Sequence, residues 1–144
     1  MKWVLLLHAG ATLMMAGVIW IIQIVHYPLF DRVGGETYIA YQSGHMALIT
    51  LVVLPLMLAE ALTGLLIAIS PPPGIPAWAA WVGLGLIGVV WFMTMFINAP
   101  QHGMLARGFD PAIHAALVAS NWIRTLAWSA RGALVLWMTA ALMR

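Results

Sequence analysis

The sequence predicts an all-α protein, a four-transmembrane-helix bundle with a polar interior. Three observations predict this fold class. Of the 144 residues, 64% are hydrophobic and only 7% are charged, whereas a soluble domain carries roughly 25% charged residues. Four apolar segments, each near the ~20 residues that cross a hydrocarbon layer, are separated by three polar breaks. The strongly polar residues inside these segments recur at helical spacing.

The predicted spans cover residues 3–27, 37–69, 77–101 and 111–143 of a single domain, 1–144. The first is longer than the apolar region of a signal peptide and no small-x-small cleavage site follows it, so we expect a retained span. Prolines in the 70–76 loop end one helix and begin the next. Pro55 is expected to kink the second span without breaking it. Asp110 before Pro111 predicts an N-cap followed by a helix-starting proline.

Composition also limits the partners. Cysteine is absent, which excludes disulfides, thiolate ligands and thiol nucleophiles. The net charge of +2 gives no argument for nucleic acid. We expect the lipid bilayer and a small lipophilic or anionic ligand as partners, and a homo-oligomer stays open. An even number of spans puts both termini on one side, which we expect to be the cytoplasm, although the Lys and Arg tally is close to even.

The polar residues form one stripe on each predicted helix, because a helix turns about 100° per residue. In lipid such groups face the bundle interior or water. With a rise of ~1.5 Å per residue, they fall into two layers. One layer lies towards the first and third loops and holds His26, His45, Asn98, His102, Asn121 and Arg124, with Gln23 beside it. The other holds Glu60, Arg131 and His8. The remaining members of the stripes are Thr12, Met15, Tyr38, Tyr41, Trp91, Thr94, His114 and Trp128.

Three histidines from three helices, His26, His45 and His102, are candidate metal ligands. Three imidazoles suit copper, iron or zinc, with a fourth position for water or substrate. The alternatives are hydrogen bonds across the bundle, contacts with headgroups, and acid–base chemistry without metal. Two of the histidines could instead ligate haem b from opposite sides, with Arg124 at a propionate.

The two deep arginines are the most costly residues, since a central Arg costs at least ~2.5 to 3.5 kcal/mol on insertion scales. Glu60 is the one acidic residue deep in the spans. We expect it to pair with Arg131 beside His8, and a proton-relay or catalytic role stays open for it. Arg124 then has no deep carboxylate partner. It would snorkel, bind carbonyl groups, or join Asn121 in orienting an oxygen-bearing ligand as a catalytic or cofactor-binding residue.

Two motifs carry a resemblance. The run Asn98-Ala-Pro-Gln-His102, followed by Asn121-Trp-Ile-Arg-Thr125, resembles the small four-helix membrane proteins of the anthrone-oxygenase-like group, which includes many bacterial proteins of unknown function. Members commonly show Asn-x-Pro closing the third span and Asn-x-x-Arg-Thr in the fourth. The resemblance implies a four-helix bundle that oxidises a small aromatic or lipophilic substrate. By motif it carries over Asn98, Pro100, Asn121 and Arg124.

The run His26-Tyr-Pro-Leu-Phe30 and His45 lie outside that general pattern and indicate a histidine-rich branch. Together these observations predict a multi-pass oxidoreductase of the bacterial cytoplasmic membrane, with a histidine-lined metal site and a small lipophilic substrate. Glu60, Arg131 and His8 would form a supporting ion-pair layer or proton path. The alternatives are a haem-binding membrane protein, a small oligomeric transporter, and an accessory subunit without catalysis.

Overall fold

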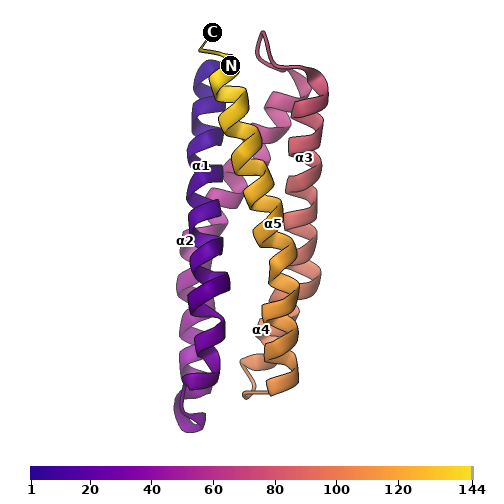
Figure 1. Cartoon of the computed structure of the whole chain (residues 1–144). Helices are drawn as coiled ribbons and strands as arrows, with labels where there is room; N and C mark the ends of the chain where they lie inside the picture. The colour runs from indigo at the N-terminus through magenta and orange to yellow at the C-terminus, as the bar shows by residue number, and fades with distance from the viewer. Residues whose placement is uncertain (144) are drawn as a thin grey trace.

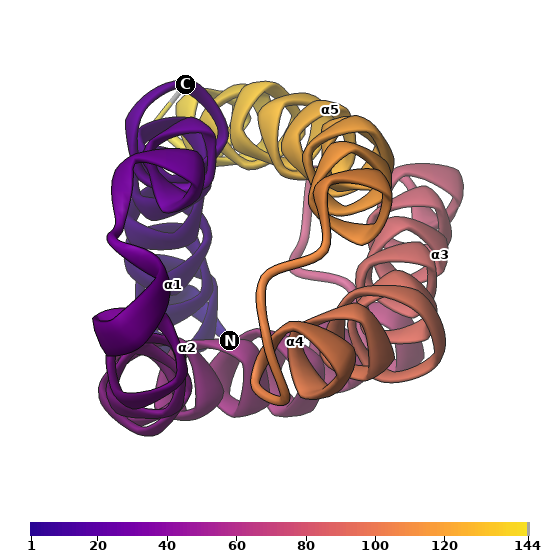
Figure 2. The ribbon, with the colours of Figure 1, turned by 90° about the horizontal axis from the view of Figure 1, so that it is seen from below.

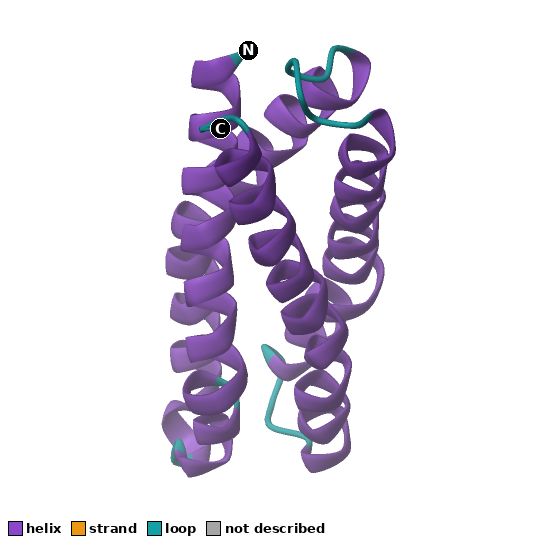
Figure 3. Cartoon of the chain, turned by 45° about the horizontal axis from the view of Figure 1, so that its top comes forward, coloured by secondary structure: helices purple, strands orange, loops and turns teal. Residues whose placement is uncertain are grey.

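The computed structural model describes residues 1–143, and this part of the chain is helical with short turns and holds no strand (Figure 3). The turns lie at the two ends of the molecule. The α-helices are α1 (Lys2–Ile21), α2 (Gly35–Ile69), α3 (Ala77–Phe92), α4 (Ala99–Leu105) and α5 (Pro111–Ala141). Two π-helical segments, η1 (Ile22–His26) and η3 (Met93–Asn98), and one 3-10 segment, η2 (Pro28–Arg32), continue or join them.

The helices form a four-helix bundle, which confirms the predicted fold class. α1 packs beside α2 and α5, and α3 packs beside the same two helices. Seen from below, the columns stand around a common centre in the order α1, α2, α3, α5 (Figure 2). Successive columns run in opposite directions, so both termini lie at one end (Figure 1).

Three helical stretches are long and apolar enough to cross a membrane: Lys2–Arg32, Gly35–Ile69 and Ala77–Leu105. Large apolar side chains such as Leu48, Leu51 and Phe96 are exposed on their outer faces. α5 stands beside them as the fourth column but is not among the three. Its inward stripe, which includes Arg124 and Arg131, lowers the hydropathy of the helix. The first and third stretches run past the predicted ends at 27 and 101.

Prolines explain the two π-helical segments. η1 ends two residues before Pro28 and η3 ends two residues before Pro100. Proline lacks an N–H, and its ring clashes with the carbonyl four residues earlier in a regular α-helix. A wider π turn before the proline relieves both problems. The third column therefore continues through Pro100, and both π segments carry polar residues of the predicted stripes.

The other predicted helix signals behave as expected. Pro55 lies inside α2, which continues through it. The Oδ1 atom of Asp110 accepts hydrogen bonds from the backbone N–H groups of Ala112 (2.8 Å) and Ile113 (3.1 Å). This confirms the N-cap, with Pro111 at the first helical position of α5.

Candidate ligand site around Arg124 and the histidine cluster

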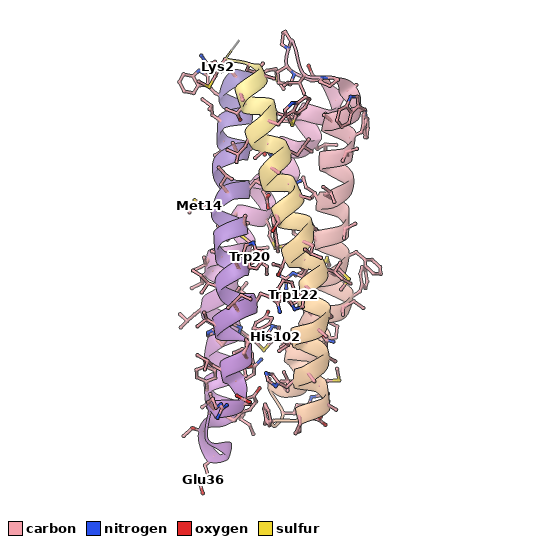
Figure 4. All side chains as sticks on the ribbon, viewed as in Figure 1. Lys2, Met14, Trp20, Glu36, His102 and Trp122 are labelled. Atoms are coloured by element: carbon pink, nitrogen blue, oxygen red, sulfur yellow. The ribbon has the colours of Figure 1, made fainter. Side chains whose placement is uncertain are left out.

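Most of the polar residues predicted to face inwards are buried between the helices. Figure 4 shows this for His102, which lies within the lower half of the bundle, while Met14 points outwards. His26 is half-buried. Those that are buried are His8, Gln23, His45, Glu60, Asn98, His102, Asn121, Arg124 and Arg131.

Of the two predicted polar layers, the one farther from the first and third loops is centred on an ion pair between Glu60 and Arg131. This confirms the predicted pairing. Arg131 donates to Oε1 of Glu60 from Nη2 at 2.7 Å and from Nε at 3.2 Å. Thr12 also donates to Oε1, at 2.7 Å, and the indole N–H of Trp128 donates to Oε2 at 2.9 Å. Both carboxylate oxygens are therefore occupied. The catalytic role predicted for Glu60 stays a prediction.

His8 completes this layer as a neutral imidazole. Thr63 donates its hydroxyl proton to the carbonyl of Ala59 at 2.5 Å, so its oxygen accepts from Nδ1–H of His8 at 2.7 Å. Nε2 of His8 is then the acceptor that faces Nη2 of Arg131 at 3.5 Å. Nη1 of Arg131 donates to the carbonyl of Gly83 at 2.7 Å. The layer is thus a closed network that joins all four columns.

Arg124 lies seven residues before Arg131 on the same stripe of α5, but its hydrogen bonds differ from those of Arg131. It is 5% exposed, and among residues 1–143 it has no salt bridge to a carboxylate. Nη1 donates to Oδ1 of Asn121 at 3.2 Å and faces Oδ1 of Asn98 at 3.5 Å. The guanidinium carbon lies 5.3 Å from the ring centre of Trp128. Nε is buried and has no hydrogen-bond partner in the described part of the chain.

Neighbouring amides fix the oxygens that hold Nη1. Nδ2 of Asn121 donates to Oε1 of Gln23 at 2.8 Å, and Nδ2 of Asn98 donates to the Ser120 hydroxyl at 2.9 Å. Because each amide nitrogen is held elsewhere, each amide oxygen is turned towards Arg124. Gln23 therefore acts inside an apolar helix as a positioning residue, since it orients Asn121 from η1.

Arg124 borders a cavity of about 130 Å³. Its wall combines polar groups from Tyr27, between η1 and η2, and from α2, η3, α4 and α5 with apolar side chains. This cavity is smaller than the ~300–1,000 Å³ of ordinary ligand pockets, so it has room for the headgroup of a ligand. The lining residues are Ile22, Tyr27, His45, Met46, Ile49, Thr50, Val53, Thr94, Asn98, Ala99, His102 and Arg124.

The three candidate metal ligands lie next to one another beside this cavity. Nε2 of His26 is 2.8 Å from Nδ1 of His45, and the ring centres of His45 and His102 are 5.3 Å apart. Gln42 donates from Nε2 to Nδ1 of His102 at 2.8 Å. The other nitrogen of His102, Nε2, then carries the proton and donates to the Tyr27 hydroxyl at 2.7 Å. Nε2 of His45 is buried and meets no hydrogen-bond partner within residues 1–143.

These contacts engage the three histidines in two separate hydrogen-bonded groups, His26 with His45 and His102 with Gln42 and Tyr27. His26 and His45 face each other, and both ring nitrogens of His102 are engaged. Within residues 1–143 no group of three or more His, Cys, Asp or Glu side chains is arranged to hold a metal ion. Binding of copper, iron or zinc by this trio stays a prediction. Haem b also stays a prediction, and the cavity has no room for its macrocycle.

Two residues of the site differ from the sequence interpretation. Tyr41 was expected on the inner face of the second helix, but it is 37% exposed and lines a surface groove of about 480 Å³ beside His26 and His45. Gln42 is buried in its place. The spacing of Tyr38, Gln42 and His45, four and then three residues, is the helical signal that identifies Gln42 as the inward residue.

Tyr27 is the second difference. A tyrosine near the end of a predicted span is expected to anchor at the membrane interface, yet the Tyr27 side chain is 3% exposed and its hydroxyl bonds to His102. The turn into η2 before Pro28 brings it inside. No pattern in the sequence predicts this contact, because it depends on where the π-helical segment directs the following residue.

No protein-family model, curated protein or solved structure matches the chain. The resemblance to the anthrone-oxygenase-like group therefore stays a prediction from its two motifs. The fold and site define a helical bundle with apolar outer faces and a small cavity beside an arginine that has no acidic partner among residues 1–143.

Proposed function

We propose that this protein is an integral membrane protein, with α5 as its fourth span, that binds a small lipophilic molecule through an oxygen-bearing headgroup at Arg124. The observation that carries the proposal is the contrast between two arginines of α5. Arg131 is paired with Glu60, whereas Arg124 is also buried, lines a cavity and keeps a buried N–H that has no acceptor among residues 1–143.

Energy supports a ligand at this position. An arginine at the centre of a span costs at least ~2.5 to 3.5 kcal/mol, and a buried donor without a partner costs about 1–3 kcal/mol. A ligand oxygen at Nε of Arg124 would offset both costs. The cavity volume of about 130 Å³ suits such a headgroup, and the apolar remainder of the molecule would extend into the bilayer.

The same cavity offers groups for acid–base chemistry. His102 donates to Tyr27, which leaves the tyrosine O–H free to donate to a ligand oxygen. His45 contributes a nitrogen that has no partner in the protein. A headgroup at Arg124 would thus meet a charge, a hydroxyl donor and an imidazole, which are the components that general acid–base catalysis uses.

Binding to purified protein tests the proposal. The variant Arg124→Gln removes the charge, and Arg107→Gln, at an exposed arginine, is the matched control. Loss of a charge-assisted hydrogen bond, worth about 1.5–3 kcal/mol, should weaken binding roughly tenfold to a hundredfold. Dodecanoic acid, dodecanol and a decyl-substituted benzoquinone are suitable probes, and native mass spectrometry would show a molecule retained from the membrane. Equal affinities of the wild type and Arg124→Gln for every probe would contradict the proposal.

A second candidate is a metal-dependent oxidoreductase, which His45 favours because its ring lies close to those of both His26 and His102 and its Nε2 has no partner among residues 1–143. A metal there would require other rotamers of its neighbours. It would supply Lewis-acid or redox chemistry close to the headgroup site. For either candidate we place both termini in the cytoplasm of a bacterial cell, as the sequence analysis expects.

A further inference from the structure

We propose that the headgroup is a carboxylate on an apolar chain, and that this amphiphile reaches Arg124 sideways from the bilayer, between α2 and the η3–α4 segment. The inference rests on the proposed function and names its ligand class and its route. It follows from two independent features of the structure: the edge of the guanidinium that is left unbound, and the side on which the cavity opens.

The unbound edge of Arg124 is the one that a carboxylate fits. In Arg131, Nε and Nη2 both donate to the Glu60 carboxylate, at 3.2 and 2.7 Å. In Arg124 the hydrogen bonds to Asn98 and Asn121 run from Nη1, the Tyr27 side chain lies close to the guanidinium, and Nε is buried with no partner among residues 1–143. A guanidinium fork matches the planar carboxylate geometrically. α5 therefore carries one arginine whose Nε–Nη2 edge binds a carboxylate, Arg131, and a second, Arg124, whose Nε is left for a ligand.

The surroundings suit an anion. The lining of the cavity contains no Asp or Glu, so a carboxylate there would meet no like charge. The amide oxygens of Asn98 and Asn121 lie at Nη1, on the part of the guanidinium away from the unbound edge. The Tyr27 hydroxyl lines the same cavity and can donate to a carboxylate oxygen.

Aromatic packing closes the cavity towards the nearer end of the bundle. η2 folds Phe30 inwards until it is 0% exposed. Its ring centre lies 5.2 Å from those of His26 and His45 and 6.2 Å from that of His102. Leu105 is also fully buried, and the turn from α4 to α5 passes across this end (Figure 2). This packing lies between the loop end and Arg124.

The cavity is also closed on the side of the Glu60–Arg131 layer. Met57, Val90 and Trp128 are buried in the core that separates the cavity from the Glu60–Arg131 layer. Access from either end of the bundle would require this packing to open.

The side facing lipid is open. The lining residues that remain exposed or half-buried all belong to α2 and the η3–α4 segment: Met46, Ile49, Thr50, Val53, Thr94 and Ala99. The surface near this opening is apolar, with Leu51 72% and Phe96 64% exposed. A molecule that enters here must be soluble among acyl chains and still carry a headgroup for Arg124. An apolar chain with a terminal carboxylate meets both requirements.

A paired comparison of probes tests the headgroup. Tritium-labelled dodecanoic acid and its methyl ester share a chain but differ in charge, and both are added to protein in nanodiscs. The wild type should bind the acid at least about tenfold more tightly than the ester. Arg124→Lys keeps the charge but lacks the fork, so most of this preference should disappear, whereas Arg107→Lys should retain it. The wild-type comparison is informative even where a variant is poorly stable.

A second pair of variants tests the route. Thr50→Trp places a large side chain at the opening, while Leu51→Trp places the same side chain on the neighbouring lipid-facing position. Thr50 bonds only to its own helix, at the Met46 carbonyl, so the fold does not depend on its hydroxyl. Association of dodecanoic acid should slow at least about tenfold in Thr50→Trp and stay unchanged in Leu51→Trp.

The outcomes separate this inference from the proposed function. If the ester or the decyl-substituted benzoquinone binds as tightly as the acid, and all depend on Arg124, the headgroup site stands and the carboxylate assignment is overturned. If Thr50→Trp and Leu51→Trp associate at the wild-type rate, the lateral route is overturned. If no probe depends on Arg124, the proposed function fails together with the inference.

Discussion

Replacing the two buried arginines of α5 by methionine should change stability in different ways. Arg131→Met removes the cation from Glu60, which keeps only the Thr12 hydroxyl and the Trp128 indole as donors. Breaking a buried pair in this way costs about 3–5 kcal/mol, since an uncompensated charge remains. At roughly 2–4 °C per kcal/mol for a chain near this size, the melting temperature should fall by about 10 °C.

Arg124→Met removes much less. It loses two long hydrogen bonds, at 3.2 and 3.5 Å, and a contact with Trp128 that is worth about 0.5–2 kcal/mol. It also removes a buried charge that costs at least ~2.5 to 3.5 kcal/mol in a span. The lost contacts and the removed cost of the buried charge nearly cancel. The free energy of unfolding should therefore fall by about 1 kcal/mol or less, or rise, as is common when a functional residue is replaced.

Thermal unfolding followed by helical circular dichroism in detergent measures both changes. The double variant Glu60→Met, Arg131→Met should recover most of the loss, because replacing both members of a buried pair by apolar residues is often neutral. If Arg124→Met lowers the melting temperature as much as Arg131→Met, then Arg124 is a structural residue and the reasoning is wrong.

Three further predictions concern packing, capping and metal. Gly64→Ala should lower stability by about 1–3 kcal/mol in the same unfolding assay, because the added Cβ would come 2.5 Å from Cδ1 of Ile87. Gly85→Ala is the control, since a Cβ there meets nothing within 4 Å. Equal effects of the two variants would contradict the close packing at Gly64. Asp110→Ala should cost about 0.5–2 kcal/mol through loss of the N-cap, and an unchanged melting temperature would mean that the cap contributes nothing. Elemental analysis of purified protein should find copper, iron or zinc that falls on His45→Ala if the metal candidate is correct; stoichiometric metal that survives this change would place the ion elsewhere.

Much of this architecture could be predicted because a helix converts spacing into direction. The stripe on each predicted span placed Glu60 and Arg131 inwards at matching depth, and the structure pairs them at 2.7 Å. Asp110 before Pro111 predicted the start of α5, since capping depends on neighbouring residues alone. These features follow from local geometry and from the hydrophobic effect, which requires polar groups to turn away from an apolar exterior.

Contacts across the bundle could not be predicted in the same way. Spacing indicates that Arg124 and Arg131 share a face, but it does not show that one guanidinium is filled and the other is not. That difference has two causes. Glu60 lies at the depth of Arg131, and the amide oxygens of Asn98 and Asn121 contact Arg124 at Nη1 and not at Nε.

The sequence by itself determined an all-helical chain, its polar stripes, the depth of its ion pair and the capped start of α5. Only the tertiary structure decided that His26 bonds to His45 while His102 bonds to Gln42 and Tyr27, that Phe30 closes one end, and that Arg124 faces a cavity which opens to the side. The physical reason is that helix register is a local property, whereas the π turns before Pro28 and Pro100 change that register. Which side chains then meet across the bundle depends on all four columns at once.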